Sequence, residues 1–126
     1  MGETIEAVLS SKAEVAAADA VRKMLIHNLQ ILKNNGVAIA IGSDSFRQTS
    51  APEALSLQKL KAFDNLTLLK MWCETTAATI FPKRKIGHLK DGYEASFLVL
   101  GGDPLQDFGN VTKIEKRFKQ GDFINP

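Results

Sequence analysis

The fold class of this chain depends on a stretch in its first half, which reads GVAIAIGSDS over residues 36–45. Residues 37–41 are all apolar and three of them are β-branched, so a strand formed here has no face suited to water. This composition is typical of a parallel strand that is covered on both faces. The polar run from Gly42 to Ser45 follows directly, and α/β proteins place their catalytic groups at this end of a strand.

The residues before this stretch predict a helix over residues 13–34, because they are rich in Ala, Leu and Lys and contain no Pro or Gly. Apolar residues recur on one side of that helix at Val21, Leu25, Leu29 and Leu32. Gly36 predicts the helix end, since glycine tolerates the left-handed conformation that closes a last turn. A helix, a tight turn and a buried strand together form an αβ unit.

The residues after this stretch predict two more helices, followed by a segment of short strands. Pro52 suits the first turn of a short helix that ends near Lys61, and Asn65 is the predicted N-cap of a helix over 66–79. Beyond Pro82, short strands are predicted over 86–89, 95–100 and 113–119, with turns at 90–93 and 120–122. The predicted domains are therefore residues 1–82 and residues 83–126.

Composition excludes several classes of protein. The 126 residues carry 16 Lys and Arg against 14 Asp and Glu, and no basic stripe indicates a nucleic-acid partner. No apolar run approaches the roughly 18 residues that suggest a membrane span. The single cysteine, Cys73, excludes an intrachain disulfide. It fits a reducing compartment, which favours the cytoplasm and otherwise leaves the localisation open.

Three segments, in this order, resemble the C-terminal third of the amidohydrolase superfamily, especially its imidazolonepropionase-like and adenine-deaminase-like metal-dependent hydrolases. They are GVAIAIGSDS at 36–45, IGHLKDGYEASFLVL at 86–100 and GDPL at 102–105. The resemblance implies an α/β fold, the C-terminal fragment of a (β/α)8 barrel. Residues 1–82 would supply its last strand and flanking helices, and residues 83–126 would form part of a small β-sandwich domain. Ser96 stands where the family usually carries Asp.

The resemblance also implies a hydrolase that acts on non-peptide C–N bonds, such as cyclic amides, amides or amidines, with a divalent metal, zinc being favoured. Asp44 is the predicted metal ligand and proton acceptor, because a carboxylate beside a metal can deprotonate the attacking water. Ser43 and Ser45 are expected to shape the turn that holds Asp44. A structural interpretation stays open, in which Asp44 forms an Asx turn or caps the next helix.

Most of the family's metal ligands have no counterpart in this chain, so the chain alone is expected to be inactive. His27 and His88 are its two histidines, and neither follows a predicted barrel strand. A Ser43, His27 and Asp44 triad is conceivable, but nothing in the spacing favours it.

A different class of function remains open, namely a non-enzymatic α/β scaffold or interaction domain. For the hydrolase the expected partner is a small-molecule substrate, with no nucleic acid and no membrane. The segment 37–41 lacks partner strands within the chain, so we expect exposed apolar surface and either self-association or dependence on the missing barrel portion.

Overall fold

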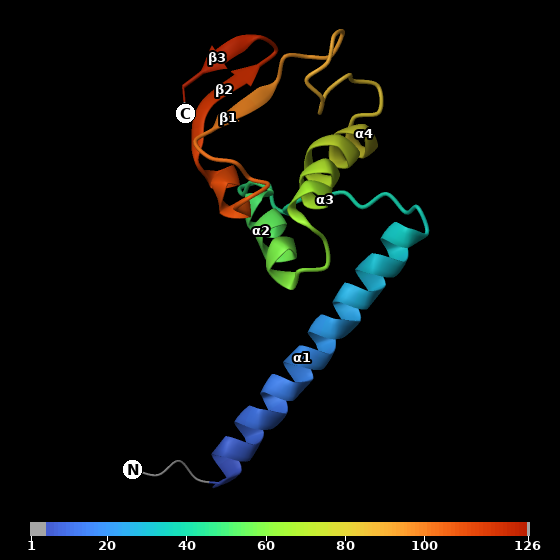
Figure 1. The fold of residues 1–126 in the computed structure, drawn as a ribbon, viewed down its shortest axis with the longest axis vertical. Coiled ribbons are helices and arrows are strands. Elements are labelled where there is room, and N and C mark those ends of the chain that lie inside the picture. The colour runs from blue at the N-terminus through green and yellow to red at the C-terminus, as the bar shows by residue number, and fades with distance from the viewer. Residues whose placement is uncertain (1–4, 126) are drawn as a thin grey trace.

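A computed structural model describes residues 5–125, with side chains from residue 11 onward. Helices occupy the first two thirds of the chain and a small sheet the last third (Figure 1). The elements are α1 (Ile5–Asn34), α2 (Ala51–Leu60), α3 (Asn65–Lys70), the π-helical turn η1 (Met71–Thr75), α4 (Thr76–Ile80), β1 (Phe97–Leu100), the 3-10 helix η2 (Phe108–Thr112), β2 (Ile114–Lys119) and β3 (Asp122–Ile124).

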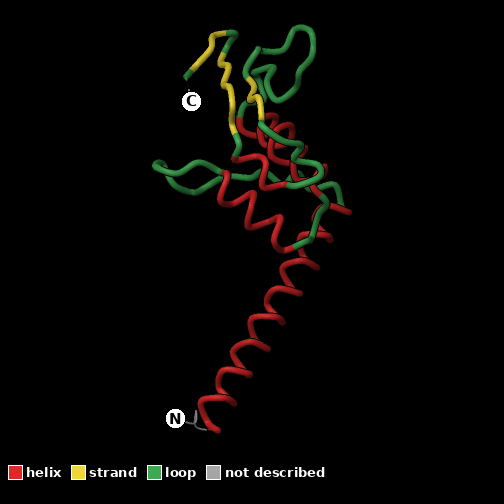
Figure 2. The backbone as a smooth tube through the Cα atoms, turned by 60° about the vertical axis from the view of Figure 1, so that its left-hand side comes forward, coloured by secondary structure: helices red, strands yellow, loops and turns green. Residues whose placement is uncertain are grey.

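Helix α1 begins earlier than predicted and ends as predicted. At its C-terminal end Gly36 has φ +73°. The Gly36 N–H donates to the carbonyl of Lys33 and the Val37 N–H to that of Leu32, which is the Schellman pattern of helix termination. The N-terminal half of α1 projects away from the rest of the chain in both views (Figures 1 and 2).

The helix predicted over 66–79 is confirmed as α3, η1 and α4, which follow one another without a break. Its N-cap is Asp64 rather than Asn65, because the Asp64 carboxylate accepts a 2.7 Å hydrogen bond from the Thr67 N–H. In the π-helical turn the Thr76 N–H reaches back to the Met71 carbonyl. The short helix predicted after Pro52 is confirmed as α2.

The core lies where α2, α3 and η2 meet the end of segment 37–41. Its buried apolar residues are Ile41, Ala54, Ala62, Phe63, Leu68, Met71, Phe108 and Val111. Leu68 and Phe108 are the largest of the fully buried side chains. Because these residues come from both predicted domains, the helices and the 3-10 helix before β2 share one apolar interior.

The sheet is antiparallel throughout, in the order β1-β2-β3. Phe97 of β1 lies opposite Phe118 of β2, with ring centroids 4.7 Å apart. A two-residue turn at Gln120 and Gly121 joins β2 to β3, and both residues have positive φ, as tight hairpins require. The strands predicted over 95–100 and 113–119 are confirmed, whereas residues 86–89 form no strand.

The predicted (β/α)8-barrel fragment and its α/β class are wrong. Within residues 5–125 the chain is a small helical domain followed by a three-stranded antiparallel sheet, and no barrel is closed. Residues 37–41 form no strand and pair with no described strand, and Ile41 packs in a core made mostly of helical residues. The apolar composition still predicted burial at one position, since Ile41 is 3% exposed. Likewise, no second sheet among the described residues faces β1-β2-β3 to make a sandwich.

Candidate functional site

Asp44 lies in a turn that the neighbouring serines build. The Ser43 hydroxyl donates to the Ser45 carbonyl at 3.0 Å and lies 3.1 Å from the Gln48 carbonyl, and it accepts from the Ser45 N–H at 3.3 Å. The Ser45 hydroxyl accepts from the Arg47 N–H at 3.4 Å. These bonds close the turn that carries Asp44 and stabilise the residues after it.

Asp44 itself has φ +50°, a left-handed conformation that Asp tolerates better than most residues. It caps neither following helix, because the N-cap of α2 is Ser50 and that of α3 is Asp64. Within residues 5–125 no hydrogen bond or ion pair holds its carboxylate, and the side chain is exposed. The turn therefore presents a free carboxylate three residues after the buried Ile41.

The other predicted candidates do not join Asp44. His27 is exposed on α1. His88 lies beside Glu74, with 3.8 Å between its Nδ1 and a carboxylate oxygen, and contacts the Tyr93 ring edge-on at 5.2 Å. No group of three or more His, Cys, Asp or Glu residues that could hold a metal occurs in the described part of the chain. The residues present therefore do not make a zinc site, which takes at least three protein ligands.

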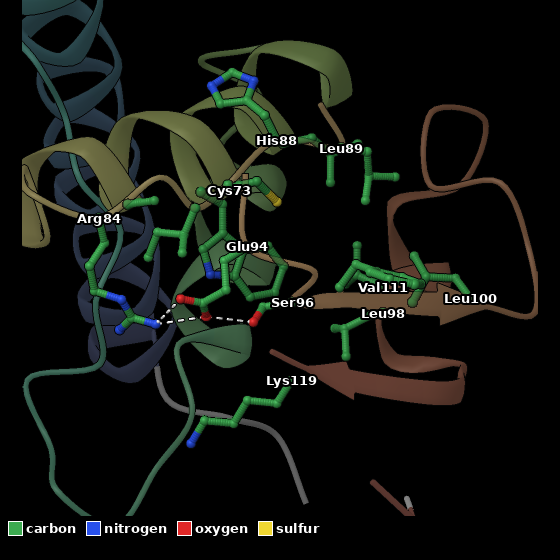
Figure 3. Close-up of a pocket in the computed structure, with 16 residues that line it drawn as sticks. Cys73, Arg84, His88, Leu89, Glu94, Ser96, Leu98, Leu100, Val111 and Lys119 are labelled. Carbon is green, nitrogen blue, oxygen red and sulfur yellow. Dashed lines mark hydrogen bonds and ion pairs between the residues drawn. The ribbon is translucent and has the colours of Figure 1, made fainter. Parts of the chain in front are cut away.

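A cavity of about 560 Å³ lies on another side of the molecule, between η1 and α4, the loop over 84–96 and strand β1 (Figure 3). Its walls are mostly apolar, formed by residues such as Leu69, Trp72, Leu98 and Val111. Asp44 does not line it. Its volume and mostly apolar lining are in the range of small-ligand pockets.

A hydrogen-bonded network of polar side chains lies at one end of this cavity, and the sequence did not predict it. The Arg84 guanidinium donates to both oxygens of the Glu94 carboxylate, at 2.7 and 2.8 Å. The Ser96 hydroxyl donates to Glu94 at 2.7 Å (Figure 3). It also accepts from the Gln120 N–H at 3.0 Å. The Arg84 guanidinium, and then the Ser96 hydroxyl, lower the pKa of Glu94. This network links the loop over 84–96 to the hairpin turn, but no spacing of residues in the sequence predicts it.

Cys73 lines the same cavity. Desolvation raises the pKa of its thiol, and the neighbouring Glu74 carboxylate adds to the effect. A thiol with a raised pKa is a weak nucleophile, since the thiolate is the reactive form. The Cys73 thiol is therefore poorly suited to act as a nucleophile in this cavity.

No protein-family model and no curated protein matches this sequence. A similar solved structure is the crystal structure of an uncharacterized protein, with a TM-score of 0.67 and 25% identity. The match covers 79% of this chain and 26% of that chain, so the present chain spans about a quarter of that protein's length. That likeness concerns the fold, because the neighbour's description states no activity. Within residues 5–125 no helix is both long and apolar enough to cross a membrane.

Proposed function

We propose that this chain contributes Asp44 to a metal-dependent hydrolase of the amidohydrolase kind, acting on non-peptide C–N bonds of a small molecule. The observation that carries the proposal is the Asp44 turn. Hydrogen bonds from Ser43 to the backbone of Ser45 close the turn around it, the residue adopts a left-handed conformation, and its carboxylate is not engaged by any described residue. A carboxylate held in this way can accept a proton without first breaking a hydrogen bond or an ion pair.

The proposal requires further groups outside these residues. A bound divalent metal would supply an activated water at neutral pH. Since the described residues do not form a metal site, the remaining ligands would come from a longer polypeptide, and the chain alone would be inactive. In that protein the Asp44 carboxylate would be placed to accept a proton from the attacking water, and Ser43 and Ser45 would keep the turn in position.

The test uses the complete polypeptide that carries this sequence, supplied with zinc and a panel of cyclic amides, amides and amidines. Product release is followed by mass spectrometry. Asp44→Asn is expected to lower kcat by a factor of about 10² or more, in line with the loss of a general base. The matched control is Asp91→Asn, which removes the same charge from another exposed turn and is expected to leave kcat unchanged. An active Asp44→Asn enzyme, or a wild-type protein that hydrolyses none of the panel, would overturn the proposal.

A second candidate function, a non-enzymatic binding domain, is supported by the cavity beside β1. Its mostly apolar walls and its few polar groups suit an amphiphilic small molecule. Saturable quenching of Trp72 fluorescence by a hydrophobic probe such as ANS, abolished by Leu98→Glu on the cavity wall, would support this function. Equal binding of the probe by wild type and variant would exclude it.

A further inference from the structure

The loop over residues 42–50, which carries the candidate carboxylate, is joined at both ends to η1 and the first residue of α4. At the start of the loop the Ile41 N–H donates to the Thr76 hydroxyl at 2.8 Å. At its end the Trp72 indole N–H donates to the Ser50 hydroxyl at 2.7 Å. The partners are 35 and 22 residues apart in sequence, so both bonds are tertiary anchors rather than parts of a local turn.

Thr76 uses its backbone and its side chain together in the first anchor. Its N–H reaches five residues back to the Met71 carbonyl, which is the spacing of a π-helix, and its hydroxyl donates to the same carbonyl at 2.7 Å. With the hydroxyl proton committed to Met71, the oxygen is left as an acceptor, and the Ile41 N–H binds there. Trp72 lies four residues before Thr76 and therefore projects toward the same side of the helix.

The Ser50 hydroxyl has a role in the second anchor that differs from an ordinary helix cap. Ser50 is the N-cap residue of α2, where a serine hydroxyl usually accepts from an N–H two or three residues later. It makes no such bond, and its oxygen accepts from the Trp72 indole instead. The hydroxyl at the start of α2 thus fixes the end of the loop on η1.

Between the two anchors little else fixes the loop to the rest of the described chain. The hydrogen bonds that residues 42–49 make within the described part of the protein all stay inside the loop. Phe46 in its middle is fully exposed and packs on nothing. The buried Ile41 side chain fixes the point where the loop begins, and the bond to Thr76 fixes the direction in which the backbone leaves the core.

We propose that Thr76 and Trp72 are positioning residues for Asp44, which lies three residues after the first anchor. On this view η1 is the platform that sets the orientation of the Asp44 carboxylate, in keeping with the frequent occurrence of π-helical turns at functional sites. The catalytic consequence rests on the proposed function of Asp44, whereas the anchoring of the loop does not. A displacement of about 1 Å in a proton acceptor can cost on the order of 10²-fold in rate.

The first test measures the anchor without reference to activity, by hydrogen–deuterium exchange of the Ile41 amide in the complete polypeptide. Thr76→Val removes the hydroxyl and keeps the side-chain shape, and it is expected to speed this exchange about fivefold or more. Thr76→Ser keeps the hydroxyl and should restore the slow exchange. Thr79→Val is the matched control at an exposed threonine of α4 and should change nothing. Unchanged exchange in Thr76→Val, or equal speeding of the buried Leu68 amide, would overturn the anchor.

The second test is the kcat of the same polypeptide on the substrate that it hydrolyses best. Thr76→Val is expected to lower kcat at least about tenfold with KM unchanged, because the anchor orients the proton acceptor and does not touch the substrate. Thr76→Ser should restore kcat, and Thr79→Val should leave it as in the wild type. A variant with fast exchange and wild-type kcat, in an enzyme that Asp44→Asn inactivates, would overturn the positioning role.

The second anchor is tested from both of its ends. Trp72→Phe removes the indole N–H and Ser50→Ala removes its acceptor, and each should lower kcat. Since the two changes break the same bond, the double variant should be no slower than the slower single variant, and additive losses would overturn this anchor. A wild-type polypeptide that hydrolyses nothing would overturn the proposed function of Asp44 instead, and the exchange measurements would still decide whether the anchors hold the loop.

Discussion

Gly87 is the position where a single added methyl group tests the packing most sharply. Its φ is +90°, and a Cβ added there would overlap the carbonyl oxygen of Cys73 and lie 3.0 Å from the Cβ of Ala77. The loop that carries Gly87 therefore passes against the π-helical turn with no room for a side chain. Gly92 provides the comparison, because it has φ +80° in the same loop and a methyl group added there would meet no atom within 4 Å.

The two glycines separate the backbone cost from the packing cost. Alanine in a left-handed conformation costs about 1–2 kcal/mol, and lower entropy of the unfolded chain returns about 0.4–1 kcal/mol. Gly92→Ala should therefore destabilise the protein by about 1 kcal/mol. Gly87→Ala carries the same cost and adds about 1–3 kcal/mol for overpacking against a backbone atom, for a total of about 2–4 kcal/mol.

The assay is urea unfolding followed by circular dichroism, at one protein concentration because self-association shifts apparent stability. The expected result is a clearly lower midpoint for Gly87→Ala than for Gly92→Ala, with similar slopes. Equal loss of stability in the two variants would show that the loop does not lie against the Cys73 carbonyl. The position of the loop that bounds the cavity would then be contradicted.

Three further predictions concern the core, a helix cap and a thiol. Leu68→Ala should lower the free energy of unfolding by about 2–5 kcal/mol, since Leu68 is fully buried. Leu66→Ala, at a half-exposed site, should lower it by well under about 1 kcal/mol. Urea unfolding measures both changes. Asp64→Ala should lower the melting temperature above pH 4, because hydrogen bonds from the following helix turn stabilise the ionised Asp64 carboxylate and lower its pKa. The difference in melting temperature between wild type and variant should vanish as the pH falls below 3.8 and through the lowered pKa of the folded state. A difference that does not change with pH would contradict the cap. Cys73 should react with iodoacetamide more slowly at pH 8 than a free cysteine does, because its pKa is raised, and Glu74→Gln should speed the reaction. Mass spectrometry gives the reaction rates. An unchanged rate in the variant would contradict the effect of the Glu74 carboxylate.

The local elements of this chain were predictable because their signals lie within a few residues of each other. The end of α1 follows from Gly36, whose left-handed conformation closes the Schellman pattern. The hairpin between β2 and β3 follows from Gln120 and Gly121 between two runs of strand-forming residues. The turn around Asp44 also follows from its neighbours, since its hydrogen bonds come from Ser43 and Ser45.

The architecture was not predictable in this way. The apolar residues 37–41 indicate burial but carry no information about what buries them, and here Ile41 packs among helices while its N–H donates to the Thr76 hydroxyl at 2.8 Å. The hydrogen-bond network of Arg84, Glu94 and Ser96 was likewise not predictable, because the spacing of these residues matches no helix or strand period. A strand exists only where a second strand supplies its hydrogen bonds, and a cavity only where distant walls meet. Both are properties of the packed chain, because residues far apart in sequence must come together to form them.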